Sequence, residues 1–282
     1  RITFSGGKRI RPALVYWGYR SVGGKDLKNV INACFSVELF QTFALIHDDI
    51  MDKSEKRRGI KTTWKKWNIN KAILTGDLCL SLADEYFPKK ANKKYFDLLK
   101  KETCLGQYLD IQDNKKFSEK QVKQILDFKT ARYTIARPLQ IGASFKTKDN
   151  SKLKTLFLYG KKMGVVFQTR DDLLGVFGDS EKTGKPVGDD ISEGKKTLLT
   201  AKLFTKKSSL GKDELKKFKQ LFGSKEKLTD KENNFIINLF KKYNIDKEVI
   251  AEMKKEAKQA RKIIENSDIK EKEKLLQITE YI

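Results

Sequence analysis

Apolar residues recur every three or four positions along most of the chain, which is the spacing of helices with one buried face. In Val30–Ile46 they occupy positions 30, 33, 34, 37, 40, 44 and 45, and similar spacing returns in Leu153–Phe167 and Phe235–Ile264. Alternation of apolar and polar residues, the mark of a strand, is scarce, and the four prolines lie far apart. We therefore predict an all-α fold.

Two stretches interrupt the helical pattern. Gly178–Lys196 contains four glycines and a proline and is the clearest predicted loop. Ser208–Lys231 is a weaker candidate for a linker. No repeat of fixed period is visible, although a pair of aspartates follows an apolar run in two places.

Those paired aspartates are the strongest sign of chemistry in the sequence. HDDIMD at 47–52 contains Asp48, Asp49 and Asp52, and FQTRDD at 167–172 contains Asp171 and Asp172. Residues four apart share one face of a helix, so Asp48 and Asp52 are expected to project in the same direction. Clustered carboxylates suit Mg²⁺, which completes its coordination shell with water and phosphate oxygens. A solvated helix end would explain one such motif, whereas two of them favour a metal site.

The composition favours an anionic partner. Lys and Arg number 60 against 37 Asp and Glu, a formal net charge of +23, which suits nucleic acid, a membrane surface or phosphorylated small molecules. The lysine-rich segments also fit a solvated surface. No apolar run approaches the roughly 18 residues of a membrane span, and no signal peptide is visible. Cys34, Cys79 and Cys104 form no CxxC pair, so we expect buried free thiols and a cytoplasmic location.

Basic side chains accompany both acid motifs. Each of them alone fits an ordinary surface residue. Together, metals held between acids and surrounded by Lys and Arg describe a site for a diphosphate. The candidates are Lys8 and Arg11 in GGKRIRP, then Arg57, Arg58, Lys129, Lys185 and Lys195.

Six motifs together resemble one known family. In chain order they are GGKRIRP at 6–12, HDDIMDKSEKRRG at 47–59, GQYLD at 106–110, KTARY at 129–133, FQTRDD at 167–172 and GKPVGDDISEGKKT at 184–197. The chain resembles the trans-isoprenyl diphosphate synthases, the polyprenyl synthase family, and most of all the archaeal-type geranylgeranyl and farnesyl diphosphate synthases. The resemblance implies an isoprenoid synthase-type helical bundle around a deep central cavity, one domain over residues 1–282, and a homodimer. It also leads us to expect a further helical segment ahead of Gly6.

The activity that the resemblance implies is Mg²⁺-dependent head-to-tail condensation of isopentenyl diphosphate with an allylic diphosphate. Asp48, Asp52 and Asp171 match the residues that hold three Mg²⁺ ions in the family, and Asp49 and Asp172 match supporting acids. The other matched positions are Arg57, Lys129 and Lys185 for the allylic diphosphate, Lys8, Arg11, Gln41 and Arg58 for isopentenyl diphosphate, Thr130 and Gln168 near the developing carbocation, Gln107 and Asp110 in the site wall, and Tyr133 and Lys195 as further substrate contacts.

Two positions qualify the match. The second acid motif of the family is commonly DDxxD, but Gly175 stands where its last Asp would be, which leaves the second clamp incomplete. His47 is the one histidine and is read as a helix-end residue, so no general base is evident. The released diphosphate is expected to take the proton.

The product length is predicted from the helix that leads into Asp48. Ala44 lies one turn before Asp48 and is small, whereas Phe40 lies two turns before it and would floor a pocket roughly 12 Å deep. The resemblance adds Phe43, because an aromatic at that position limits chain length in family members. Both phenylalanines would also fit a helical core. We predict the C20 product, geranylgeranyl diphosphate, with the C15 farnesyl product or a longer chain as alternatives.

Other classes of protein are weighed against this prediction. A class I terpene cyclase also uses an aspartate-rich motif but needs no isopentenyl diphosphate site, and an inactive regulatory subunit would not need an intact first motif. A nucleic-acid-binding protein would suit the charge, yet no reader motif is recognisable and paired acids repel phosphate. We therefore expect no nucleic-acid partner. The lysine-rich surface leaves room for peripheral contact with an anionic membrane.

Overall fold

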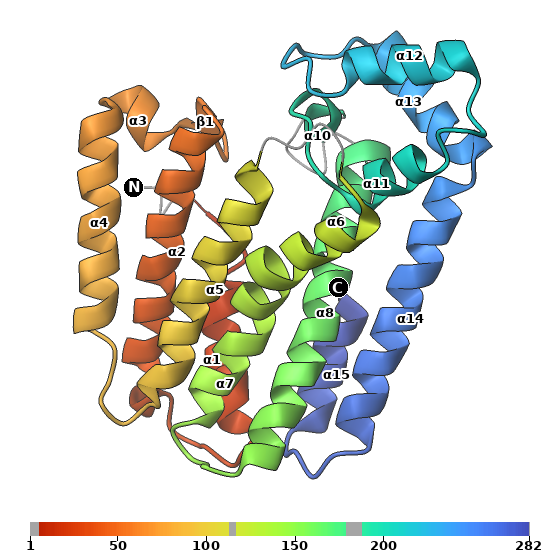
Figure 1. Cartoon of the computed structure of the whole chain (residues 1–282). Coiled ribbons are helices and arrows are strands. Elements are labelled where there is room, and N and C mark those ends of the chain that lie inside the picture. Colours follow the sequence, from red (N-terminus) through yellow and green to blue (C-terminus); the bar gives the residue numbers. More distant parts are fainter. Residues whose placement is uncertain (1–5, 113–116, 179–187, 282) are drawn as a thin grey trace.

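A computed structural model describes residues 6–112, 117–178 and 188–281, and these are almost wholly helical (Figure 1). The first part of the chain forms α1 (Ile10–Arg20), η2 (Leu27–Asn29), α2 (Ile31–Met51), β1 (Lys56–Arg57), β2 (Ile60–Lys61), α3 (Thr63–Lys66), α4 (Ile69–Glu85) and α5 (Lys93–Ile111). The second part forms α6 (Glu119–Ile125), η3 (Leu126–Ala136), α7 (Arg137–Ala143), α8 (Asn150–Phe177), α10 (Asp189–Ser192), α11 (Leu198–Thr205), α12 (Lys212–Leu221), α13 (Asp230–Lys242), α14 (Ile245–Glu265) and α15 (Lys272–Tyr281). The prediction of an all-α fold is confirmed.

Two large apolar clusters hold most of the described helices together, and a small one around Ile46 and Ala72 joins α2 to α4. The larger includes Phe40 of α2 and Phe96 of α5 and takes in α1, α7 and α15. The second large cluster is centred on Phe218 and Phe240, in α12 and α13. Helices α8 and α14 are long enough to contribute to both clusters, so they join the lower bundle to the upper cap in Figure 1.

An unusual helix lies between α6 and α7. The segment η3 is a π-helix of 11 residues, with Lys129 and Thr130 in its first half. Pro138 follows two residues after its end; a proline has no N–H to donate and its ring crowds the carbonyl four residues earlier, which disfavours tight α-helical turns before it. Because the turns of η3 are wider, side chains four residues apart in it, such as Lys129 and Tyr133, do not align as they would in an α-helix.

Small residues let the neighbouring helices approach η3 closely. A Cβ built on Gly106 of α5 would lie 2.4 Å from the backbone nitrogen of Lys129. A Cβ on Gly164 of α8 would lie 2.2 Å from the Cα of Ala131. Side chains at these glycines would collide with backbone, so η3 is held between α5 and α8 at main-chain distance.

The sequence did not predict the short hairpin after α2. Strands β1 and β2 pair antiparallel with Arg57 opposite Ile60, which leaves Arg58 and Gly59 as the two loop residues. Both have positive φ, 52° and 76°, as a type I′ turn requires. The hairpin turns the chain back beside the end of α2, so Arg57 lies over the first acid motif.

Several smaller predictions are settled by the structure. The proposed linker Ser208–Lys231 contains the helix α12, and the predicted loop Gly178–Lys196 contains α10, with residues 179–187 outside the described part. All three cysteines are free, but Cys34 alone is buried, while Cys104 is exposed, so that part of the prediction is wrong. Within the described residues, no helix combines the length and apolar content needed to cross a membrane.

Candidate active site

The first acid motif lies in the last turn of α2. Asp48 accepts a hydrogen bond of 3.3 Å from Nη2 of Arg57 through Oδ2, and its Oδ1 lies 3.4 Å from Nζ of Lys129. Asp52 is the C-cap residue of α2. The residue as a whole is exposed, but the protein around its carboxylate shields that group from part of the water. That shielding, and then the negative charge of Asp48, raise the pKa of Asp52 to about 6. A cation placed here would relieve both effects.

Asp49 faces inward and anchors the hairpin. Nε of Arg57 donates to Oδ1 of Asp49 at 2.7 Å, and the carboxylate is fully buried. Burial raises its pKa to about 6 against the opposing effect of Arg57. Its Oδ2 is buried without a hydrogen-bond partner. An orphaned carboxylate oxygen is costly in a folded protein, so this acid motif has spare capacity for a metal-bound water or a cation.

Lys129 connects the first motif to α5. Its Nζ lies 2.5 Å from Oδ2 of Asp110 and 3.4 Å from Asp48. Burial alone would lower the pKa of Lys129, but Asp110 and Asp48 outweigh it and raise the pKa. The side chain is therefore a fixed positive charge at the mouth of the site.

The second acid motif lies near the end of α8 and is bonded to Thr130, the residue of η3 that follows Lys129. The hydroxyl of Thr130 donates to Oε1 of Gln168 at 3.0 Å, and Nε2 of Gln168 donates to Oδ1 of Asp172 at 2.9 Å. Burial, with the charges of Asp190 and Asp171, raises the pKa of Asp172 to about 7. Asp171 itself is exposed beside it. Adjacent residues of η3 thus contact the two acid motifs.

One lysine lies near both acid motifs. The positive charge of Lys195 acts on Asp52 of the first motif and on Asp172 of the second, lowering the pKa of each against the larger effect of burial. Lys195 is itself paired with Asp190 at 2.6 Å and Glu193 at 2.9 Å. Lys195 therefore accompanies both motifs, as Lys129 and Thr130 of η3 do.

Gly175, the departure from DDxxD, is explained by a neighbouring acid. A Cβ built on Gly175 would lie 2.6 Å from Oδ2 of Asp190, which comes from α10. Asp190 is buried and its carboxylate occupies the space that a side chain at 175 would need. Sequence reasoning missed Asp190, although it lies within the GKPVGDDISEGKKT motif.

No ready-made metal centre exists among the described residues: no three His, Cys, Asp or Glu side chains gather closely enough to hold an ion. The available ligands are carboxylate oxygens in small groups, with cations between them. This suits Mg²⁺, which takes one or two carboxylates and completes its shell with water and substrate phosphate. The donor set fits the implied metal only when a diphosphate supplies the remaining oxygens.

A second group of cations lies beside the hairpin. Burial, followed by the charges of Arg9, Arg57 and Arg11, lowers the pKa of Arg58, although Glu38 opposes this. Such crowding of positive charge is favourable only when an anion binds. Arg58 donates to the carbonyl of Gly6. The GGKRIRP segment and the hairpin therefore form one cluster of positive charge suited to an anion, which we call the anion-binding corner.

Comparison with known proteins identifies the family. The sequence profile described as polyprenyl synthetase matches residues 1–239. The chain belongs to this family. A "Short chain isoprenyl diphosphate synthase" of Methanocaldococcus jannaschii is 34% identical over 249 residues, covering 85% of this chain and 74% of the relative. The "Geranylgeranyl diphosphate synthase" of Sulfolobus acidocaldarius is 33% identical over 255 residues, covering 86% and 75%.

The fold matches solved members of the polyprenyl synthetase family. The geranylgeranyl pyrophosphate synthase of Corynebacterium glutamicum, described as complexed with isoprenyl diphosphate and magnesium, superimposes with a TM-score of 0.91. It is 30% identical, and the match covers 98% of this chain and 86% of that one. The resemblance predicted from the six motifs is confirmed.

In this polyprenyl synthetase family member, the structure brings most of the predicted residues together. Asp48, Asp49, Asp52, Arg57, Asp110 and Lys129 are linked by the contacts above, as are Thr130, Gln168 and Asp172. Lys8 is described only as exposed, and Lys185 lies outside the described residues. Sequence reasoning also missed Arg9, which pairs with Glu38, and Lys196, whose Nζ donates to the carbonyls of Asp110 and Gln112 at 2.7 and 2.5 Å.

Three predicted substrate contacts have protein partners. The hydroxyl of Tyr133 donates to Oε1 of Gln41, and the guanidinium of Arg11 lies 4.1 Å from the centre of the Tyr133 ring. Nη2 of Arg11 donates to Thr134 at 2.7 Å. Gln107 lies elsewhere, with Nε2 donating to Sδ of Met51 at 3.6 Å. Arg11, Gln41 and Tyr133 therefore form one connected group, in which Gln41 and Tyr133 are buried and Arg11 is half-buried.

The chain-length candidates on α2 differ in their surroundings. Phe40 is fully buried, with ring centres 5.7 Å from Tyr133 and 6.3 Å from Phe96. Phe43 and Ala44 are half-buried, and the Phe43 ring lies 4.6 Å from that of His47. Phe40 is thus part of the core, while Phe43 keeps an accessible surface one turn nearer the acids.

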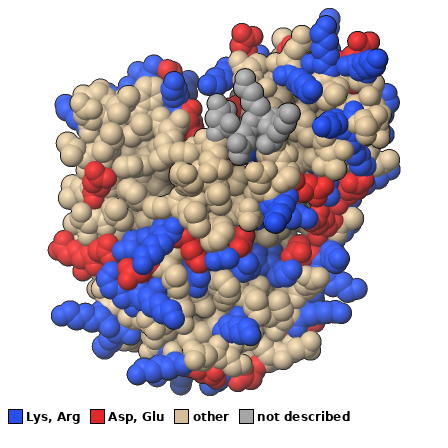
Figure 2. All heavy atoms as spheres, in the orientation of Figure 1, with Lys and Arg blue, Asp and Glu red and all other residues tan. Residues whose placement is uncertain are grey.

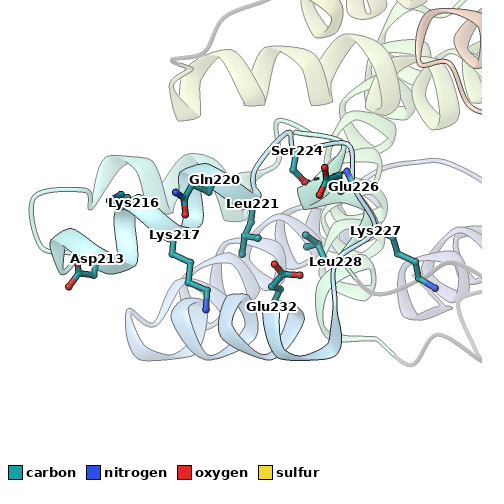
Figure 3. Close-up of a pocket in the computed structure, with 10 residues that line it drawn as sticks. All are labelled: Asp213, Lys216, Lys217, Gln220, Leu221, Ser224, Glu226, Lys227, Leu228 and Glu232. Carbon is teal, nitrogen blue, oxygen red and sulfur yellow. Dashed lines mark hydrogen bonds between the residues drawn. The ribbon is translucent and has the colours of Figure 1, made fainter.

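A surface groove between α12 and α13 does not compete with this site (Figure 3). Its charged lining consists of three lysines and three acids, so it carries no net charge to attract a diphosphate. These residues are Lys216, Lys217, Lys227, Asp213, Glu226 and Glu232.

Proposed function

We propose that this protein is a magnesium-dependent prenyltransferase that condenses isopentenyl diphosphate with an allylic diphosphate. The observation that supports the proposal is that adjacent residues of η3 contact the two acid motifs, Lys129 the first and Thr130, through Gln168, the second. Two sets of acids brought near each other, with lysines beside them, suit a metal-bridged diphosphate.

Asp48, Asp52 and Asp171 would hold the metal, and we expect three Mg²⁺ ions. When bound, the ions neutralise the diphosphate and favour its departure as a leaving group. Asp49 and Asp172 support the ligands from behind, and Asp190 supplies the carboxylate that Gly175 lacks. Substrate phosphate oxygens and water would complete each coordination shell.

The remaining cations divide between the two substrates. Arg57, Lys129, Lys185 and Lys195 would grip the allylic diphosphate and stabilise the charge that develops on it. Lys8, Arg11, Arg58 and Gln41 would bind isopentenyl diphosphate at the anion-binding corner. Arg9 joins this second group because it lies close enough to Arg58 to affect its pKa.

The allylic carbon–oxygen bond then ionises and the double bond of isopentenyl diphosphate attacks the resulting cation. The Thr130 hydroxyl has its hydrogen committed to Gln168, so its lone pairs remain to face positive charge. His47 is 3.4 Å from Asp77 on α4 and packs on Phe43, away from a role as base. Proton loss to the released diphosphate completes the condensation. Gln107 and Asp110 would complete the wall of the substrate site.

We infer geranylgeranyl diphosphate as the main product. The support is the half-buried Phe43 beside a small Ala44, and the names of similar proteins. The C15 product is the second candidate, because Phe43 lies only five residues before Asp48.

Assembly and location are inferred from the surface. We treat residues 1–282 as one domain, since α8 and α14 belong to both apolar clusters. A second copy of the chain would cover the exposed apolar residues of α4.

Lysines in the loops at the lower end of the molecule (Figures 1 and 2), such as Lys89, Lys90 and Lys146, would allow contact with an anionic membrane. Sedimentation with anionic and with neutral vesicles tests this contact.

The proposal is tested by product analysis. Purified protein is incubated with isopentenyl diphosphate and each allylic starter, in Mg²⁺ and in chelator, beside Asp48→Ala. We expect the wild type to form a C20 diphosphate in Mg²⁺ but not in chelator. The Asp48→Ala variant should be folded but inactive. Condensation by the variant at the wild-type rate would refute the assignment of the first acid motif.

A further inference from the structure

The π-helix η3 needs something to hold it. Helices with i→i+5 bonding are rare and mostly limited to a single turn, yet η3 runs for 11 residues and carries Lys129 and Thr130. The backbone N–H of Arg137 donates to the carbonyl of Arg132, five residues earlier, so the wide bonding continues to its end. The side chains of these two arginines show what stabilises this geometry.

Four charged residues form a connected group, which we call the Glu102 cluster: Glu102, Asp127, Arg132 and Arg137. Arg132 donates from Nε and Nη2 to Oδ2 of Asp127 at 3.0 and 2.7 Å, and from Nη1 to Oε1 of Glu102 at 2.8 Å. Arg137 donates from Nε and Nη2 to the two oxygens of Glu102 at 2.7 and 2.6 Å. Glu102 and Arg137 are buried, so these paired bonds form where water cannot replace them.

The spacing of the cluster suits a π-helix. Asp127 and Arg132 are five residues apart, the separation that i→i+5 bonding joins. In an α-helix, residues five apart are rotated by about 140° and face away from each other. The ion pair between Asp127 and Arg132 therefore stabilises one wide turn, while Glu102 connects Arg132 and Arg137 to α5.

The turn that this ion pair stabilises includes the two residues that contact the acid motifs. Lys129 and Thr130 lie between Asp127 and Arg132 in the chain, and they contact Asp48, Asp110 and Gln168. Returning one turn to α-helical bonding would rotate them by about 100° relative to α7. Lys129 would then no longer reach the first acid motif while Thr130 reaches the second.

We propose that the Glu102 cluster is a positioning device for the condensation reaction, which keeps η3 π-helical and so aims Lys129 and Thr130 at the two acid motifs. The proposal rests on the role proposed above for Lys129. The cluster's members act through η3 and touch no substrate. Lys161 of α8 adds a further contact, 3.0 Å from Oδ1 of Asp127.

A double-mutant cycle with Lys129 tests this. Steady-state kcat and KM for both substrates are measured for Arg132→Met, Lys129→Ala and the double variant. We expect Arg132→Met to lower kcat about tenfold with little change in KM for isopentenyl diphosphate, and to cost less than about threefold once Lys129 is gone. Equal losses in both backgrounds, or no loss in either, would overturn the positioning role.

Further variants separate this role from general destabilisation. Asp127→Asn is nearly isosteric, removes the same turn-spanning ion pair, and replaces Arg132→Met in the cycle if that variant does not fold. Lys162→Met is the matched control, because its 2.8 Å pair with Glu256 joins α8 to α14 without touching η3. It should keep the wild-type kcat. Full activity of Lys129→Ala would instead refute the proposed role of Lys129, and the positioning role with it.

Discussion

At the scale of single residues, we propose that Asp190 compensates for Gly175 in the second acid motif. The missing last Asp of DDxxD removes a carboxylate from α8, but Oδ2 of Asp190, from α10, lies 2.6 Å from the position that a Cβ on Gly175 would take. Asp190 also pairs with Lys195, whose charge acts on both acid motifs. The second clamp would then draw its carboxylates from two helices, α8 and α10.

Exchanging the two residues tests this compensation. Gly175→Asp alone should lower kcat about tenfold or more, because its side chain collides with Asp190 and adds a like charge. Asp190→Ala alone should also impair turnover and raise the Mg²⁺ concentration needed for half-maximal activity. The combination of both changes should recover activity to within about threefold of the wild type.

Asp189→Asn serves as the control for this exchange, since no atom of Asp189 is among those within 4 Å of the position of a Cβ on Gly175. It should leave the Mg²⁺ dependence unchanged. A combined variant that is no better than Asp190→Ala would show that the two positions do not share a carboxylate.

At the scale of elements, α2 both carries the first acid motif and offers the surfaces that limit product length. Its period places Ala44 and Phe40 one and two turns before Asp48, as the sequence predicts, and the family resemblance adds Phe43. The structure separates their tasks, because Phe40 is packed between rings of the core while Phe43 is half-buried. Core packing and product length should therefore respond to different substitutions.

Phe43→Ser should lengthen the product beyond C20 with a small effect on stability, because it opens a partly accessible surface. Ala44→Phe is the reciprocal variant and should shorten the product. Phe40→Ala should mainly destabilise the fold, by about 3–5 kcal/mol for a buried phenylalanine. Chromatography of dephosphorylated products and thermal melts measure the two effects. An unaltered product distribution in Phe43→Ser would place the floor elsewhere.

The elements that the sequence predicts are those with a regular apolar period. Helix α2 and helix α8, which end in the two acid motifs, follow directly from this period. The π-helix η3 could not be predicted in this way, because the contacts proposed to hold it include Glu102 from another helix as well as its own residues. The hairpin was missed because Arg58 adopts a positive φ that its residue type does not favour.

At the scale of the whole molecule, the face of α4 is unusual for a charged protein. Leu74 and Leu78 are 69% and 59% exposed, with Ile69 and Ile73 beside them on the same helix. The upper left of Figure 2, where α4 lies in Figure 1, shows few charged side chains. Contiguous exposed apolar surface marks an interaction site, and a second copy of the chain is the partner we propose.

Replacing both leucines with glutamate should convert a dimer to a monomer without unfolding it, because both side chains are already exposed. Light scattering coupled to gel filtration measures the mass. Lys255→Gln with Lys258→Gln, which changes the net charge by the same amount on exposed positions of α14, should leave the dimer intact. A wild-type monomer, or a dimer that survives the leucine changes, would contradict the proposed interface.

The central claim is that both acid motifs hold metal on the same diphosphate. Calorimetric titration with inorganic pyrophosphate, in Mg²⁺ and in chelator, tests it in the wild type, Asp48→Asn, Asp171→Asn and the double variant. We predict that each single change removes most of the Mg²⁺-dependent affinity and that the double variant binds little worse than either one. Wild-type affinity in Asp171→Asn, or losses that simply multiply in the double variant, would show that the motifs serve separate sites.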